Sequence, residues 1–99
     1  MLIEPKSIEL PNEAVATAKM VGLRYVTDTA PGFSRKRSKN GFRYIDAKGK
    51  PITDKKTIAR IKSLVIPPAW DKVWISPWEN GHIQATGRDA KNRKQYRLY

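Results

Sequence analysis

The sequence predicts an α+β domain in which two helices accompany a small antiparallel sheet of about five strands. Short segments of alternating apolar and polar residues recur along the chain, separated by short turns rich in glycine, proline, asparagine and aspartate. Two further segments carry apolar residues at helical spacing. With 99 residues, the chain has room for one domain with a modest core.

The N-terminal part of the chain is expected to hold one of the two helices. Pro11 suits the first position of a helix over residues 11–21, and Gly22 suits the position just after its end. Residues 1–10 show no clear period and are expected to be a flexible N-terminus. The domain itself is therefore expected to span residues 11–99.

The next part is expected to form a short strand, a basic loop and a hairpin. Residues 23–27 have the composition of a strand, whereas residues 29–41 are punctuated by glycine, proline, serine and asparagine, which is typical of a loop. Residues 42–46 alternate as a strand, and residues 51–53 begin the returning strand. Gly49 is expected at a positive φ in the turn between them.

The second helix is expected to begin after Thr53 or Asp54, since either side chain can cap its N-terminus. Ile58 and Ile61 begin an apolar stripe at helical spacing. The pair of prolines that starts at Pro67 must follow the end of this helix, because proline lacks a backbone donor and restricts the preceding residue.

Three more strands are expected, over residues 72–76, 82–87 and 93–98, with short turns between them. In the second of these strands, Ile83 and Ala85 are expected on one face, opposite the polar residues that alternate with them. The last two strands would form a hairpin at the end of the chain.

The three tryptophans admit two interpretations. Trp70, Trp74 and Trp78 could serve as stacking platforms for single-stranded bases. Because they lie around an Ile-Pro-Pro turn, core positions are favoured for Trp70 and Trp74, while Trp78 is left open.

Charge is the property that bears most on function. The formal net charge is +11 and the isoelectric point is about 10.2. The first 22 residues carry two lysines against three glutamates, so the positive charge lies after Gly22. Such a self-repelling surface favours a polyanionic partner, above all nucleic acid, with an anionic membrane or an acidic protein as alternatives. The sequence contains no run of about 18 apolar residues, so it predicts no membrane span.

The sequence lacks the motifs of nucleotide-binding and catalytic sites. Cysteine is absent, which excludes disulfides and thiolate metal sites. His82 is the only histidine and is expected to be a surface or packing residue, and the acidic residues lie near expected turns and caps. We therefore expect no catalytic residue, no metal site and no cofactor.

Two basic segments are the candidate nucleic-acid contacts. The first is the expected basic loop, whose cations can reach phosphates, although a merely solvated loop fits equally well. The second is the terminal hairpin, where cations flank a turn and a glutamine and a tyrosine follow on the strand. The alternative there is that the tyrosine packs in the sheet and the glutamine faces solvent. The candidate DNA-contacting residues are Arg35, Lys36, Arg37, Arg88, Lys91, Arg93, Lys94, Gln95 and Tyr96.

Three segments carry a resemblance to a known family: GFRYIDAKGKPI, ARIKSLVIPPAWDKVWI and GHIQATGRDAKNRKQY. They resemble the N-terminal domain of bacterial type IB DNA topoisomerases, the poxvirus-like branch, and the resemblance covers about residues 23–98. It implies an enzyme that relaxes supercoiled DNA by nicking one strand through a tyrosine, forming a 3′-phosphotyrosyl link and resealing it, without ATP or metal.

The resemblance also implies a division of labour. The N-terminal domain of the family forms half of a clamp around duplex DNA, and a larger C-terminal domain carries the catalytic residues, none of which maps onto this chain. The chain is then expected to be an inactive fragment of a monomeric, cytoplasmic enzyme of the bacterial nucleoid. Its expected partners are duplex DNA and its own C-terminal catalytic domain, with no membrane involved.

The resemblance extends to single residues of the last strand. The family's Gln-Tyr pair matches Gln95 and Tyr96, and the basic residues before it match Arg93 and Lys94. A second tyrosine usually follows two residues after the pair, where this chain has Leu98. The terminal tyrosine comes one residue later, which places it on the other face of a strand.

Two other functions fit part of the pattern. A generic RNA-binding or ribosome-associated basic domain would share the charge. A self-contained enzyme would need Tyr44, Tyr96 or Tyr99 as its nucleophile, and the sequence offers few acid or base partners for one.

Overall fold

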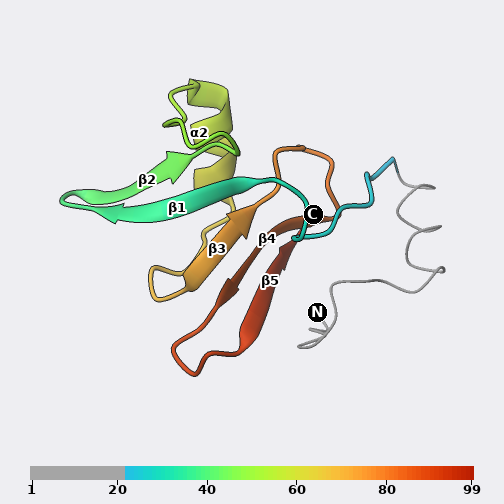
Figure 1. Ribbon diagram of the computed structural model, residues 1–99. Helices are drawn as coiled ribbons and strands as arrows, with labels where there is room; N and C mark the ends of the chain where they lie inside the picture. Colours follow the sequence, from blue (N-terminus) through green and yellow to red (C-terminus); the bar gives the residue numbers. More distant parts are fainter. Residues whose placement is uncertain (1–21) are drawn as a thin grey trace.

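The computed structural model describes residues 22–99, which form a five-stranded antiparallel sheet with one helix against it (Figure 1). The strand order across the sheet is β2-β1-β3-β4-β5. The predicted small antiparallel sheet is thereby confirmed, and the helix predicted over residues 11–21 lies outside the described residues. The elements are β1 (Phe33–Ser38), β2 (Gly41–Ile45), α2 (Lys55–Ser63), β3 (Asp71–Ile75), β4 (Ile83–Arg88) and β5 (Lys94–Leu98).

Strand β1 occupies the segment that was predicted to be a loop, so that prediction was wrong. β1 pairs with β2 from Ser34 opposite Ile45 to Ser38 opposite Gly41, with a turn at residues 39–40. The basic composition conceals a strand period of two, in which alternate arginines lie over the ring of Phe42. The long side chains thus cover apolar surface that a loop would leave bare.

The hairpin expected over residues 42–53 is present only in outline. Gly49 has a φ of 84°, as predicted for the turn. The returning segment makes an isolated bridge between Ile45 and Pro51 and a hydrogen bond from the Ile52 N–H to the Tyr44 carbonyl, rather than a strand. Proline has no N–H to donate to a ladder, which explains why the pairing stops there.

The strand predicted over residues 23–27 was also wrong. This segment makes only a single parallel bridge, between Arg24 and Gly81. Its backbone is bound instead to His82: the Val26 N–H donates to the imidazole Nδ1 at 3.0 Å, and the His82 N–H donates to the Arg24 carbonyl at 2.9 Å. A side chain therefore takes a position that a ladder would need.

Helix α2 begins and ends as predicted. The Asp54 carboxylate caps it by accepting from the Thr57 N–H at 2.9 Å. Ile61, 1% exposed, is the residue that faces the core most completely. After the helix, Val65 has a φ of 50°, a left-handed conformation that is strained for a branched side chain.

Strands β3, β4 and β5 form the remaining antiparallel ladder, and two irregularities interrupt it. One lies in β3 between Asp71 and Trp74, and the other lies between Ile83 and Ala85 where β4 pairs with β5. Ile83 and Ala85 consequently belong to different clusters, so the prediction that they share a face was wrong. An extra residue in a ladder shifts the alternation that follows it.

The two clusters lie on opposite faces of the sheet, because neighbouring residues of β3 contribute to different ones. The helix-side cluster consists of Ile61, Trp70, Val73, Ile75 and Ala85. The other consists of Val26, Ile83 and Tyr96, with Trp74 and Trp78 packed against it. The core position predicted for Trp70 is confirmed, since it is 8% exposed, and Trp74 is half-buried with its Nε1 donating to the Ala30 carbonyl.

Candidate nucleic-acid interface

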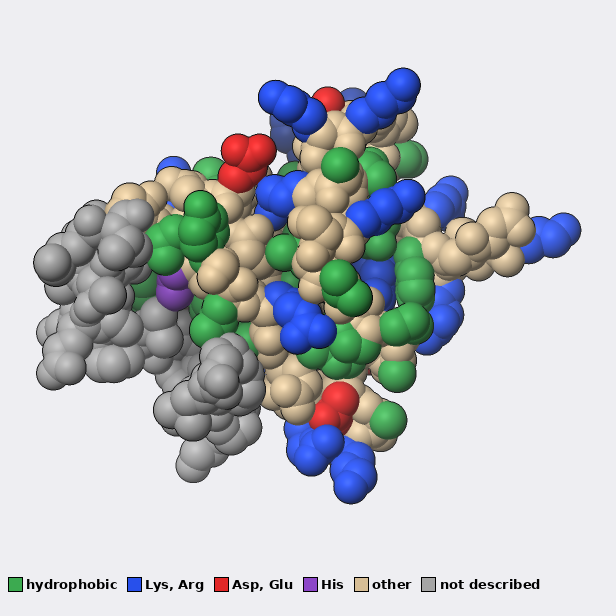
Figure 2. All heavy atoms as spheres, turned by 180° about the vertical axis from the view of Figure 1, so that it is seen from behind, with side chains coloured by type: hydrophobic (Ala, Val, Ile, Leu, Met, Phe, Trp, Pro, Cys, Tyr) green, Lys and Arg blue, Asp and Glu red, His purple; other side chains and the backbone are tan. Residues whose placement is uncertain are grey.

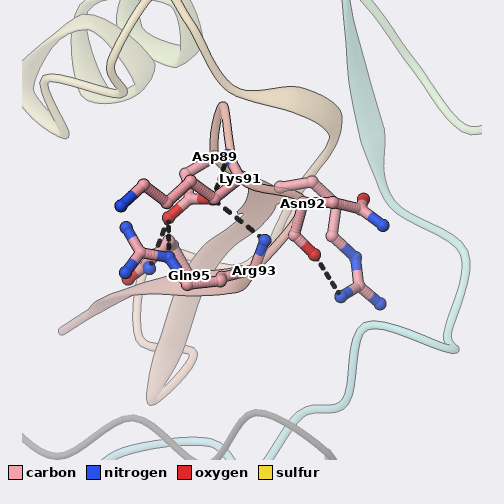
Figure 3. Close-up of polar contacts among 6 residues, drawn as sticks. Asp89, Lys91, Asn92, Arg93 and Gln95 are labelled. Atoms are coloured by element: carbon pink, nitrogen blue, oxygen red, sulfur yellow. Dashed lines mark hydrogen bonds and ion pairs between the residues drawn. The ribbon is translucent and has the colours of Figure 1, made fainter.

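The turn between β4 and β5 is organised by one carboxylate (Figure 3). Asp89 accepts through one oxygen from the N–H groups of Lys91 and Arg93, both at 2.9 Å. Through the other oxygen it accepts from the Arg93 Nε at 2.8 Å and the Gln95 Nε2 at 3.0 Å. These donors, with the Arg93 N–H first among them, lower the pKa of Asp89 to about 2. The turn therefore has a defined shape although it lies at the surface.

This turn projects cations into solvent. Lys91 is exposed, and the side chain of Arg93 is 62% exposed although it is paired with Asp89. Arg88 is half-exposed and donates to the Asn92 carbonyl at 3.3 Å. Asn92 completes the turn with a φ of 61°, which asparagine tolerates better than most residues. Several of the predicted cations are thus gathered at one end of the sheet.

The next three predicted residues lie deeper. Lys94 pairs with Asp28 at 2.6 Å, and its side chain is only 15% exposed. Gln95 is half-buried and bound to Asp89, and Tyr96 is 7% exposed within the cluster of Val26 and Ile83. The structure thus matches, for Tyr96, the alternative in which the tyrosine packs in the sheet.

The first basic segment divides between the two faces of β1. The guanidinium of Arg35 donates to three carbonyls, those of Ile66, Pro67 and Trp70, at 3.2, 2.9 and 3.0 Å. Arg37, on the same face, donates to the Pro68 carbonyl at 2.7 Å. Lys36, between them in sequence, is exposed on the opposite face. Burial lowers the pKa of Arg35, because its guanidinium is partly withdrawn from water among the carbonyls of residues 66–70.

Two more arginines serve the fold in the same way, and sequence analysis did not single them out. Arg60 of α2 donates to the Gln84 Oε1 at 2.6 Å and to the Ser76 carbonyl. Arg97 of β5 donates to the carbonyls of Leu64 and Val65 at the end of α2, at 3.0 and 3.2 Å. No local pattern in the sequence marks these two arginines. In the structure, each of them lies against a loop whose carbonyl groups have no partner strand.

Residues 41–89 match the family model described as bacterial DNA topoisomerase IB, N-terminal domain. These residues belong to the type IB topoisomerase N-terminal family. The "DNA topoisomerase 1B" of Acanthamoeba polyphaga mimivirus is 44% identical over 66 residues, which cover 67% of this chain and 20% of that protein. The chain thus spans about a fifth of the length of this curated relative. No solved structure gave a significant match.

The topoisomerase match and the candidate interface overlap in part. The matched residues run from the start of β2 to Asp89, the carboxylate that organises the β4–β5 turn. Lys91, Arg93 and β5 follow the matched range. The family assignment therefore rests on the scaffold that positions the turn, independently of most of the cations within it.

Lysine and arginine side chains are spread widely over the face that carries α2, with few acidic side chains between them (Figure 2). Among residues 22–99, no three histidine or carboxylate side chains gather as metal ligands would. The helix within the same range is too short and too polar to cross a membrane.

Proposed function

We propose that this chain is the duplex-DNA-binding N-terminal domain of a type IB DNA topoisomerase. The observation that carries the proposal is the family match over residues 41–89. A net charge of +11 supports it, because phosphate neutralisation supplies most of the non-specific affinity for DNA. The domain would form one half of a clamp around the duplex.

The parent enzyme, by this proposal, relaxes supercoiled DNA through a transient 3′-phosphotyrosyl link. Its catalytic residues would lie in a C-terminal domain, which would be the second partner of this domain besides DNA. The domain alone would be a monomer without catalytic activity, and the enzyme would act in the cytoplasm on the bacterial nucleoid.

The predicted contact residues take two roles in this proposal. Solvent-facing cations would contact backbone phosphates directly, and these are Lys36, Arg37, Arg88, Lys91 and Arg93. Arg35, Lys94, Gln95 and Tyr96 would position them, since these four side chains are bound or packed within the domain. Gln95 could also reach DNA itself, because it is partly exposed and is bound to the carboxylate that shapes the turn.

Binding of the purified chain to a short fluorescent DNA duplex tests the proposal. At physiological salt we expect dissociation constants of about 10⁻⁴ to 10⁻⁶ M, and the binding should tighten steeply as the salt concentration is lowered. A structured RNA of equal length serves as competitor. If the RNA displaces the duplex at a far lower concentration than unlabelled duplex does, the RNA-binding alternative replaces this proposal.

A plasmid assay tests the second half of the proposal. The chain alone should leave supercoiled plasmid unrelaxed, because the catalytic residues would lie outside it. Reproducible ATP-independent relaxation by pure material, or a covalent adduct on one of its tyrosines, would contradict the assignment.

A further inference from the structure

A hollow of about 190 Å³ opens beside the candidate interface. It lies at the start of β3 and the adjoining ends of β4 and β5, on the sheet face opposite α2, because Thr86 pairs with Trp74 and Tyr96 of the second cluster. A single water needs about 30 Å³, so the hollow has room for a larger polar ligand. Its lining residues are Asp28, Lys72, Thr86, Gly87, Arg88 and Lys94.

A nearly buried ion pair belongs to this lining. The Lys94 Nζ lies 2.6 Å from the Asp28 Oδ2, and the two side chains are 15% and 10% exposed. The Thr86 hydroxyl donates to the same carboxylate oxygen at 2.8 Å. Asp28 therefore neutralises Lys94 and accepts the hydrogen bond of the Thr86 hydroxyl. Two donors of the hollow, the Lys94 ammonium and the Thr86 hydroxyl, are thus already bound to a carboxylate of the chain itself.

Lys72 reaches the hollow because of an irregularity in β3. Asp71 pairs with Arg88 and Trp74 with Thr86, so two residues of β3, Lys72 and Val73, oppose the single Gly87. Lys72 has a φ of 51°, in the left-handed region that costs a non-glycine residue. Bulges of this kind redirect side chains, and strained backbone of this kind accompanies functional sites. The strained conformation turns a lysine into the hollow.

The hollow carries an excess of positive charge. Lys72 is exposed, and among residues 22–99 its ammonium has no bonding partner. Within the described part of the chain, the Arg88 side chain makes one hydrogen bond, to the Asn92 carbonyl at 3.3 Å, and keeps its other donors. Because the Asp28–Lys94 pair is neutral as a whole, Lys72 and Arg88 have no counter-anion among residues 22–99.

We infer that the hollow is an oxyanion site that takes a phosphate group, with Lys72 and Arg88 as its ligands and Asp28 as an internal counter-anion that limits its affinity. For a phosphate of the DNA backbone, this inference rests on the proposed function and adds a contact on the opposite side of the sheet from α2. A free phosphate shares the chemistry and is the second source. If the Asp28–Lys94 pair only stabilised the fold, the strained backbone at Lys72 would have no function. A phosphate site gives it one, because the strained conformation directs the lysine side chain into the hollow.

Titration of the full chain with inorganic phosphate, followed by backbone amide shifts in NMR spectra, tests the inference without DNA. We expect saturable shifts at residues 72 and 86–88 and several-fold weaker binding for Lys72→Gln and Arg88→Gln. Lys48→Gln is the matched control, since it removes one exposed lysine at the turn after β2, on the opposite edge of the sheet. It should bind phosphate as the unaltered chain does.

A parallel titration with duplex DNA distinguishes the two sources. Shifts at the hollow with both ligands, or with duplex DNA alone, support a backbone-phosphate contact. In the second case Lys72→Gln should lower the salt slope of DNA binding by about 1, as loss of one phosphate contact does. Shifts with inorganic phosphate alone support a site for a free phosphate. No shift at the hollow with either ligand overturns the inference.

Two variants separate binding from structure. Asp28→Asn keeps an acceptor for Thr86 and removes the competing charge, so phosphate should bind several-fold more tightly. Lys72→Gly removes the cation and relieves the left-handed strain, so the chain should unfold at a higher temperature and yet bind phosphate more weakly. Unchanged or weaker binding by Asp28→Asn, or unchanged binding by Lys72→Gly, would contradict the site.

The outcomes also separate this inference from the proposed function. Phosphate shifts at the hollow in a chain that does not bind duplex DNA would keep the site and remove the function. Conversely, DNA binding that Lys72→Gln and Arg88→Gln both leave unchanged, without phosphate shifts, would keep the function and remove the site.

Discussion

Arg35 of β1 and the cations of the β4–β5 turn look alike in sequence and do different work in the structure. Arg35 donates to three carbonyls of the chain, whereas Lys91 stands in solvent two residues after the carboxylate that shapes its turn. A run of basic residues therefore does not by itself indicate how many of its side chains a DNA molecule can contact. Whether a side chain turns inward or outward depends on which backbone carbonyls lie nearby without a hydrogen-bond donor.

The segment after α2 explains the inward arginines. Pro67 and Pro68 interrupt regular structure, so the carbonyls around them have no ladder to join. A guanidinium offers five donors in a fixed fork, which suits several such carbonyls at once. In the β4–β5 turn, Asp89 accepts from the local backbone donors, and the side chains of Lys91 and Arg93 extend outward.

Replacing Arg35 is expected to give the largest effect, and that effect should be on stability. Arg35→Ala removes the guanidinium donor from the Ile66 and Trp70 carbonyls and leaves the Pro67 carbonyl with only the Trp70 N–H, so we expect a loss of about 2 kcal/mol in the free energy of unfolding. Chemical denaturation measures it. Lys36→Ala, on the opposite face of the same strand, is the matched control and should change stability by less than about 0.5 kcal/mol. Equal losses in the two variants would erase the distinction between inward and outward cations.

Replacing the turn cations is expected to give the converse result. The double variant Lys91→Gln, Arg93→Gln should bind duplex DNA on the order of tenfold more weakly, with a salt slope reduced by about 2. Its stability should stay within about 0.5 kcal/mol, because exposed ion pairs contribute little. Fluorescence anisotropy over a salt series measures the slope. An unchanged slope would show that DNA contacts the domain elsewhere.

The interior and the β4–β5 turn should lose stability at different pH values as the solution is acidified, and His82 in the interior should respond first. Burial lowers the pKa of His82 below its usual value of about 6.5, because the charged ring is poorly solvated there. Its Nδ1 must also be unprotonated to accept from the Val26 N–H. The neutral ring therefore stabilises the fold above about pH 6.5, and this contribution should fall as the pH drops further. Denaturation at pH 7.5 and 5 measures it, and His82→Gln should flatten the difference.

The turn should respond only at much lower pH. The pKa of Asp89 is about 2 in the folded chain against 3.8 ordinarily, so its contribution is complete above about pH 4 and is lost as the pH falls toward 2. The protection factors of the Lys91 and Arg93 amides, which correct for the intrinsic pH dependence of exchange, should fall across that range while the centre of β4 remains protected. Loss of their protection already between pH 6 and 5 would contradict the assigned hydrogen bonds.

Several elements could be predicted from local chemistry alone. The Asp54 cap, the apolar stripe of α2 and the turn signals around Gly49 and Asp89 involve residues close in sequence, and each prediction was confirmed. The antiparallel sheet followed from short strands joined by short turns. The helix predicted over residues 11–21 stays a prediction.

The errors share a physical cause, since each depends on contacts between distant residues. The sequence predicts a loop at β1 because the acceptors of its arginines lie more than 30 residues away along the chain. It predicts a strand over residues 23–27 because nothing local reveals that His82 binds their backbone. The bulge that separates Ile83 from Ala85 likewise arises from pairing with β5.

Among the candidate site residues, the cations of the turn were the most predictable part. Turn residues point outward in most hairpins, and Lys91 and Arg93 do so here. The burial of Tyr96 and Lys94 depends on Val26 and Asp28, which lie about 70 residues earlier in the chain. The sequence left the packed and exposed alternatives open for Tyr96, and packing against that distant segment decides between them.

Backbone amide shifts on titration with duplex DNA distinguish the cations that contact DNA from the cations that stabilise the fold. We expect the largest shifts at residues 88–93, and these shifts should shrink as salt rises. Residues 64–70, whose carbonyls accept hydrogen bonds from Arg35 and Arg97, should change little. Shifts concentrated at residues 64–70, or equal across both regions, would contradict the division between cations that build the fold and cations that face DNA.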